Sequence, residues 1–216
     1  MSAPQTTSDA ANMPAPIFGE PTPLGLLGLS IGCASLVPIA FGWLPSEPSQ
    51  VVMMFKTASW LCLLFGAGCQ FLAGIMSLAN KNTLGGTLLT TFSFNWVFNW
   101  WALDQASQGK VVDGRVGLAV DVAFILIFVV LTYAFGFFSK LLFAFLLDID
   151  LLYVLRIVKH FSSASLAATL GIGIGVATVL LAAIAMYIAL AMLLNPAAGR
   201  PILPIAGPLF RAGPNE

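Results

Sequence analysis

A row of polar side chains recurs every fourth residue within the apolar stretch 82–101. Its members are Thr83, Thr87, Thr91, Asn95 and Asn99. On an α-helix, each four-residue step turns the side-chain direction by only about 40°, so we expect the row to share one broad face. In a membrane helix, such hydroxyls and amides either line a wet path or hydrogen-bond to a neighbouring helix. If there is a path, we expect its pore-lining members to be Thr87, Thr91 and Asn95.

Two carboxylates lie near the middle of another apolar stretch, 141–158. Asp148 and Asp150 would each cost roughly 2.5–3.5 kcal/mol in the centre of a membrane helix on insertion scales. Residues two apart on a helix point about 200° away from each other, so both cannot face one path. We therefore expect one of them to face the path and the other to contact a partner helix or protomer. At least one should be protonated, hydrogen-bonded or in contact with water.

Three further polar residues lie inside apolar stretches. Asp121 lies about one turn into the stretch 117–138, and Arg156 lies near the end of 141–158. Antiparallel neighbouring helices would bring these two to the same membrane face, which predicts an ion pair. Gln70 lies between two glycines at four-residue spacing, and its amide would either line a pore or bond to a neighbouring backbone.

Signatures of catalysis are scarce. The single histidine, His160, follows Lys159 at the end of an apolar stretch, and we expect it at the membrane interface. The sequence contains no two-histidine metal pair, no phosphate-binding loop and no convincing nucleophile–histidine–carboxylate set. The three cysteines have no metal-binding spacing and are typical of small buried apolar residues. We expect neither enzymatic activity nor a metal or cofactor.

Composition indicates an integral membrane protein. The 216-residue chain is 59% hydrophobic and only 8% charged, with a mean hydropathy of +0.95. Soluble domains are about 25% charged. Nine basic and nine acidic residues give no net charge, so the chain lacks the basic field of a nucleic-acid-binding protein. The expected partner is therefore the lipid bilayer.

The apolar stretches predict an all-α fold of six transmembrane helices. Each is near or above the ~18–20 residues needed to cross the hydrocarbon core. We expect a disordered polar tail over 1–20, a membrane domain over 21–204, a C-terminal tail over 205–216, and both termini on one side. Glycines at 25, 28 and 32 predict a seam for close helix packing. The expected spans are 24–44, 52–78, 82–101, 117–138, 141–158 and 165–194, with a polar loop over 104–116.

Three segments resemble the acetate uptake transporter family, the succinate–acetate permeases. Residues 21–26 (PTPLGL) resemble the family's entry to its first span, Asn-Pro-Ala-Pro-Leu-Gly-Leu. Residues 70–74 (QFLAG) and 82–87 (NTLGGT), followed by Phe92 and Trp96, resemble its second and third spans. Residues 199–204 (GRPILP) resemble its carboxyl-terminal Gly-Arg-x-x-Leu-Pro. Together the segments and six spans cover most of 21–204.

The resemblance implies a six-helix protomer with its own pore, assembled into a ring-shaped homohexamer in the plasma (inner) membrane, with cytoplasmic termini. It implies a path for acetate, and also succinate, that is passive or proton-coupled. It also implies a hydrophobic constriction formed by Leu29, Phe92 and Ile149. Glu20 stands where the family has Asn and is a candidate substrate-binding residue.

The two carboxylates flanking Ile149 would repel an anion if they faced the path. A channel for a small neutral solute is therefore an alternative. A membrane assembly protein that transports nothing is another, because glycine seams and a polar row can serve helix packing alone.

Overall fold

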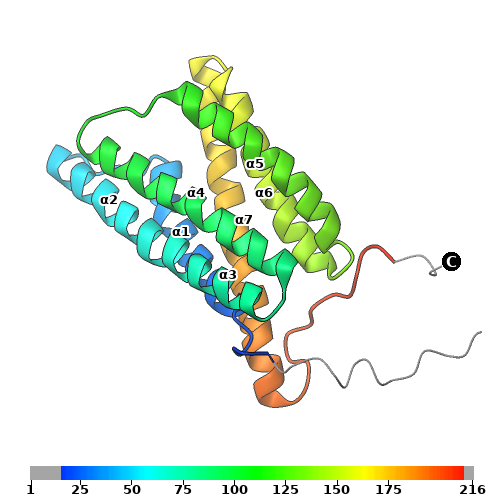
Figure 1. The fold of residues 1–216 in the computed structure, drawn as a ribbon. Coiled ribbons are helices and arrows are strands. Elements are labelled where there is room, and N and C mark those ends of the chain that lie inside the picture. The colour runs from blue at the N-terminus through cyan, green and yellow to red at the C-terminus, as the bar shows by residue number, and fades with distance from the viewer. Residues whose placement is uncertain (1–15, 212–216) are drawn as a thin grey trace, which may run out of the picture.

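The computed structural model describes residues 16–211, which are helical and contain no strand in that range (Figure 1). Three consecutive helices run without a break into one long rod, Pro48–Ala79, whose middle part is π-helical. The elements are α1 (Thr22–Ala40), α2 (Pro48–Leu61), η2 (Cys62–Cys69), α3 (Gln70–Ala79), α4 (Thr83–Ser107), α5 (Gly114–Phe135), α6 (Lys140–His160) and α7 (Ala164–Ala198).

Four helical rods are long and apolar enough to span a membrane: α1, the α2–η2–α3 rod, α5 and α7. The other two, α4 and α6, have 25 and 21 residues. At 1.5 Å per residue, they are about 37 and 31 Å long, which matches a hydrocarbon core of about 30 Å. They carry the polar row and the buried carboxylates, respectively, and this polar content makes them less apolar than the other four. Of the six expected spans, four are therefore confirmed as candidate membrane spans by both length and hydropathy, and α4 and α6 by length alone.

Local sequence signals set the helix ends. The side chain of Asn82 accepts a hydrogen bond from the backbone of Gly85 and caps α4, as Ser139 caps α6. The expected loop over 104–116 begins too early, because α4 continues to Ser107. It also ends too late, because α5 begins at Gly114. In the turn that follows α4, Gly109 has a positive φ of 73°, which glycine adopts without strain. Asp113 caps α5, and its hydrogen bonds from Arg115 lower the pKa of the Asp113 carboxyl.

Glycines allow α1 to approach the long rod closely, as the sequence predicts. A Cβ on Gly28 would lie 2.4 Å from the Cβ of Cys69 and 2.5 Å from the carbonyl oxygen of Phe65. Gly32 and Gly66 form a slot for the indole of Trp96. A Cβ at either position would lie 3.0 Å or less from that ring. Small residues at helix contacts are the usual means of close packing in membranes.

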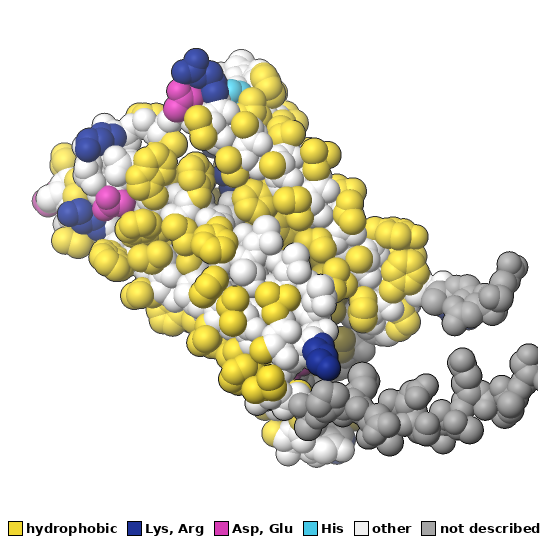
Figure 2. Space-filling view, in the orientation of Figure 1, with side chains coloured by type: hydrophobic (Ala, Val, Ile, Leu, Met, Phe, Trp, Pro, Cys, Tyr) yellow, Lys and Arg dark blue, Asp and Glu magenta, His cyan; other side chains and the backbone are white. Residues whose placement is uncertain are grey.

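The helices form a ring around a central region. α1 packs against α7 and η2, α7 against α6, and α6 against α5, while α4 packs against α2, η2 and α3. The ring closes between α4 and α5 through side chains, where the rings of Phe92 and Phe128 are 5.0 Å apart. In Figure 2, hydrophobic side chains cover most of the visible face of the bundle, and most of the visible charges gather at its ends.

The structure describes only part of each of the two expected tails. Residues 1–15 and 212–216 lie outside the described range. Residues 205–211 contact the turn between α5 and α6, since Leu209 and Phe210 donate backbone hydrogen bonds to Gly136. The ring of Phe210 also packs against Phe143. This part of the C-terminal segment is therefore attached to the bundle.

The glycine slot predicts an asymmetric response to alanine. Gly66→Ala would place a Cβ 2.5 Å from the Trp96 indole, so the indole must move. We expect a loss of about 1–3 kcal/mol, typical of an overpacked core. Gly117→Ala is the matched control, because no neighbour lies within 4 Å of its Cβ. Thermal unfolding in detergent measures both. Equal midpoints for the two variants would show that the slot is not tight.

Candidate functional site

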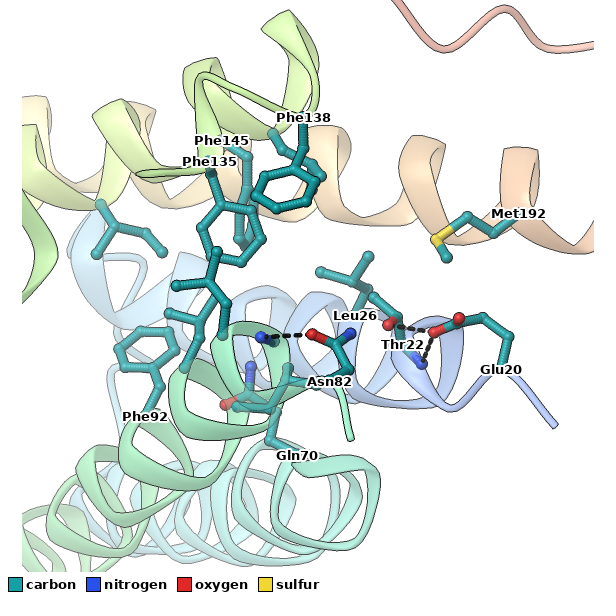
Figure 3. A pocket seen from close by; sticks show the side chains of 16 residues that line it. Glu20, Thr22, Leu26, Gln70, Asn82, Phe92, Phe135, Phe138, Phe145 and Met192 are labelled. Carbon is teal, nitrogen blue, oxygen red and sulfur yellow. Dashed lines mark hydrogen bonds between the residues drawn. The ribbon is translucent and has the colours of Figure 1, made fainter. Parts of the chain in front are cut away.

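A cavity of about 210 Å³ lies at the end of the bundle where α1, α4 and α6 begin (Figure 3). We call it the Gln70 cavity. Its walls are mostly apolar, and six rings or long aliphatic chains from α5, the α5–α6 turn, α6 and α7 face four polar residues from the other side. The lining residues are Glu20, Thr22, Leu26, Gln70, Asn82, Leu84, Gly85, Leu88, Leu89, Phe92, Phe135, Phe138, Leu142, Phe145, Ile149 and Met192.

The polar groups of the Gln70 cavity differ in their partners. The Glu20 carboxylate accepts hydrogen bonds from the backbone N–H of Thr22, at 3.0 Å, and from its hydroxyl. Asn82 is engaged as the cap of α4. Gln70 is only 1% exposed, and its Oε1 has no hydrogen-bond partner among the described residues. The amide oxygen of Gln70 is therefore not bonded to a neighbouring backbone, which was one of its two expected roles.

Two helix N-termini contribute to the electrostatics of this cavity. Unpaired N–H groups at a helix start carry partial positive charge, which stabilises anions. Glu20 and Thr22 bring the start of α1 into the cavity wall, and Asn82, Leu84 and Gly85 bring the start of α4. At α1, the Glu20 carboxylate already accepts a hydrogen bond from one of these N–H groups, that of Thr22. The cavity thus combines apolar walls with a few fixed dipoles.

A second, smaller cavity of about 110 Å³ lies further along the bundle, and we call it the Arg156 cavity. It is more polar, with two amides, an indole, a phenol and a guanidinium among its walls. The lining residues are Cys33, Leu36, Phe92, Asn95, Trp96, Asn99, Ile149, Leu152, Tyr153, Arg156, Ile174, Thr178 and Leu181.

Phe92 and Ile149 line both cavities. Along α6, Ile149 lies seven residues after Leu142 of the first cavity and seven before Arg156 of the second, which is about 10 Å each way. Ile149 is 1% exposed and Phe92 is 6% exposed. Leu29 lines neither cavity but is fully buried in the same hydrophobic cluster. The two cavities are therefore separated by an apolar partition, in which Phe92 and Ile149 face both sides.

Aromatic contacts hold Phe92 in this partition. Its ring meets Phe128 edge to face at 5.0 Å and lies 6.2 Å from the ring of Trp96. Phe128 in turn stacks on Tyr153 at 5.7 Å, and Tyr153 stacks on Phe124 at 5.5 Å. Such contacts each contribute about 0.5–1.5 kcal/mol beyond burial and restrict the rings to few orientations.

The structure contains the predicted ion pair between α5 and α6. Nη2 of Arg156 lies 2.9 Å from Oδ1 of Asp121, and Nε donates to Oδ2 at 3.1 Å. The Asp121 side chain is 9% exposed and the Arg156 side chain 30%. The guanidinium also lies over the ring of Tyr153, 5.6 Å from its centre. This two-point geometry fixes Arg156 at the wall of its cavity.

The carboxylates that flank Ile149 both turn away from the two cavities. Asp150 accepts a hydrogen bond from the hydroxyl of Thr132 on α5 at 2.7 Å. Asp148 is 5% exposed, and neither of its oxygens has a hydrogen-bond partner among the described residues. The two side chains do point to different faces, as their spacing predicts. Neither lines the Gln70 cavity or the Arg156 cavity, however, where we expected one of them.

The polar row on α4 does not stay on one face. Thr87 is exposed, Thr91 is half-buried, and neither lines either cavity. Asn95 and Asn99 line the Arg156 cavity. A drift of about 40° per step adds up to about 160° over the four steps of the row, so the row winds around the helix. Toward the Gln70 cavity, α4 presents Leu84, Gly85, Leu88, Leu89 and Phe92 instead.

Comparison with known proteins places the chain in a family. The profile of the GPR1/FUN34/yaaH family matches residues 3–205. The chain belongs to this family. It is an acetate uptake transporter family, which confirms the resemblance seen in the sequence and identifies a transport protein rather than an enzyme.

Two curated proteins are similar to about half of this chain. The glyoxylate pathway regulator of Yarrowia lipolytica (strain CLIB 122 / E 150) is 31% identical over 99 residues, which are 46% of this chain and 34% of the relative. Ammonia transport outward protein 2 of Saccharomyces cerevisiae (strain ATCC 204508 / S288c) is 29% identical over 108 residues. That match covers 46% of this chain and 36% of the relative. The chain thus spans about a third of each relative in these matches.

A solved structure shows the same fold. The bacterial acetate channel SatP superposes with a TM-score of 0.75, covering 88% of this chain and 99% of that chain at 19% identity. This chain therefore shares the all-helical fold of SatP.

Three residues escaped the sequence analysis as site residues: Trp96 and Tyr153, which line the Arg156 cavity, and Phe128, which packs against Phe92 and Tyr153. Trp96 appeared there only as part of the family resemblance. Its position could have been found from glycines 32 and 66, which leave room for a large ring. No comparable sequence signal marks Phe128 or Tyr153, because aromatic residues are frequent throughout this chain.

Cysteine labelling tests which face of α4 lines the path. In a background with the three native cysteines replaced, we expect Leu88→Cys and Asn95→Cys to react with small water-soluble thiol reagents. Both positions line cavities. Thr91→Cys should react about tenfold more slowly, since the reactive thiolate forms poorly away from water. If Thr91→Cys reacts faster than Leu88→Cys, the Thr91 face and not the leucine face lines the path.

Proposed function

We propose that this chain forms a membrane path for acetate-like small monocarboxylates, running through the Gln70 cavity, past Phe92 and Ile149, and into the Arg156 cavity. The observation that carries the proposal is the apolar partition between two cavities that share these two residues. Membership of the acetate uptake transporter family and the fold shared with the acetate channel SatP support the same path. Leu29 completes the partition from α1.

A hydrophobic constriction suits a small carboxylate. It disfavours ions that keep a full hydration shell, and it lets through a solute whose lost water can be replaced on either side. On one side, the Gln70 amide and the start of α4 offer polar groups. On the other, Asn95, Trp96 and Arg156 do so. A methyl group meets little resistance between Phe92 and Ile149.

The distribution of charge favours an anion over a cation. Arg156 lies in the wall of the Arg156 cavity, and Asp148 and Asp150 lie outside both cavities. Other side chains therefore separate these two carboxylates from an anion in the path, which weakens the repulsion that their sequence positions suggested. Glu20 is the carboxylate that faces the path, at the entry, where the start of α1 holds it by hydrogen bonds.

We further propose that all six helical rods cross the membrane and that protomers assemble into a ring-shaped hexamer in the plasma (inner) membrane. The exposed apolar residues on α5 and α7 support contact with lipid or with other protomers, for example Leu126 at 68% exposure and Ile172 at 56%. The path is then one per protomer. Transport is passive or proton-coupled.

A small neutral solute is the second candidate. The Gln70 cavity has no Lys or Arg among its lining residues, so an uncharged molecule would give up no ionic interaction by entering it in place of an anion. One curated relative is named as an ammonia transport outward protein. Acetate and ammonia uptake, measured side by side in liposomes, separates the two candidates. A protein that moves neither would instead be a membrane assembly protein.

Phe92→Ala tests the partition directly. Removing the ring should widen the constriction and raise butyrate flux relative to acetate flux. Each extra methylene is discriminated by roughly 10–200-fold in a close-fitting site, and we expect most of this selection to be lost. The measurement is uptake of radiolabelled acetate, propionate and butyrate into liposomes, with empty liposomes subtracted.

Phe94→Ala is the matched control. Phe94 lies two residues away on α4 but is 58% exposed and lines neither cavity. It should keep the wild-type size selection. A folded Phe92→Ala protein with wild-type selection would place the constriction elsewhere.

A further inference from the structure

Three buried polar atoms around the Arg156 cavity have no hydrogen-bond partner among the described residues. They are Nε1 of Trp96, the hydroxyl of Tyr153 and Oδ1 of Asn95. These residues are 2%, 2% and 5% exposed, and all three line the cavity. Unpaired buried polar groups are costly, so native proteins nearly always pair them with protein, water or a ligand. Three in one small cavity indicate that something polar binds there.

Arg156 adds further donors to the same wall. A guanidinium has five N–H groups. Nε donates to Oδ2 of Asp121, and Nη2 lies within ion-pair distance of Oδ1 of the same carboxylate. Among the described residues, the N–H groups on Nη1 therefore have no acceptor and are available. Thr178 offers no free donor, because its hydroxyl donates to the carbonyl oxygen of Ile174.

The donors of this set match a carboxylate, whereas Oδ1 of Asn95 is an acceptor and would pair with a water. An indole N–H and a phenol O–H are neutral donors, and the guanidinium is a cationic one. Leu152, Ile174 and Leu181 supply apolar wall for a short alkyl group. Asp121 is the carboxylate nearest to the guanidinium, and it is already paired. A volume of about 110 Å³ holds several waters or one small organic anion.

We propose that the Arg156 cavity is a binding site for a small carboxylate, in which Arg156, Trp96 and Tyr153 donate hydrogen bonds and Asp121 competes for Arg156. The proposal deepens the proposed function: it gives the path a specific resting site beyond the partition. Competition has a consequence for transport. Conduction requires binding that is favourable enough to enter and weak enough to leave. An Arg156 already shared with Asp121 holds the passing anion loosely.

Tyr153→Phe is the first test, because it removes one hydroxyl and keeps the ring that stacks on Phe124 and Phe128. Acetate uptake into liposomes is measured over a range of acetate concentrations. We expect the half-saturating concentration to rise about tenfold, as befits one hydrogen bond to a charged group. Tyr133→Phe is the matched control. Tyr133 is 61% exposed, lies on α5 outside the cavity, and should behave as wild type.

Asp121→Asn is the second test, and we expect it to lower the half-saturating acetate concentration, whereas a damaging substitution would raise it. Without the competing carboxylate, Arg156 should bind acetate more tightly, so both the half-saturating concentration and the maximal flux should fall. Simple damage to the fold would lower the flux without tightening binding. Size-exclusion profiles in detergent check that each variant is folded. If Asp121→Asn does not fold, the decision rests on Tyr153→Phe and on Trp96→Phe, which removes the indole N–H.

The outcomes separate this site from the proposed function. Wild-type protein that moves no acetate above empty liposomes overturns the proposed function and, with it, the resting site. Wild-type flux with unchanged half-saturation in folded Tyr153→Phe and Trp96→Phe overturns the resting site alone. A rise in half-saturation in both variants, with Tyr133→Phe unchanged, supports the site.

Discussion

The indole of Trp96 fits a slot that exists because residues 32 and 66 have no side chain. A Cβ on either glycine would press into the ring. From this anchor, aromatic contacts run through Phe92 and Phe128 to Tyr153, and the Tyr153 ring lies beneath the guanidinium of Arg156. The apolar partition and the polar cavity beyond it therefore depend on the same close packing of α1, η2 and α4. Relaxing the slot would loosen both.

The second organising constraint is the cost of charge within the membrane. Asp121 and Arg156 offset it by pairing, and Asp150 by accepting a hydrogen bond from Thr132. Ile149 lies between two carboxylates in sequence, yet it faces both cavities while they do not. The helical period makes this possible, since each residue points about 100° from the next. An acidic helix can thus contribute an apolar side chain to a path for anions.

The fold was largely predictable from sequence, and the site only in part. Apolar length marked the helical rods, and glycine spacing marked the close approach of α1, because both are local properties of the chain. The ion pair followed from antiparallel neighbours. The face of α4 was misjudged at Thr87 and Thr91, since a drift of about 40° per four-residue step accumulates over several turns. The roles of Phe128 and Tyr153 depend on contacts between distant helices, which one sequence does not encode visibly.

The central claim is that one partition, at Phe92 and Ile149, separates two water-accessible cavities on a single path. Sided labelling tests it most directly, in vesicles of uniform orientation with a membrane-impermeant thiol reagent. Leu88→Cys, in the Gln70 cavity, should react from one side only. Asn99→Cys, in the Arg156 cavity, should react only from the other. Equal labelling of both positions from the same side would contradict it.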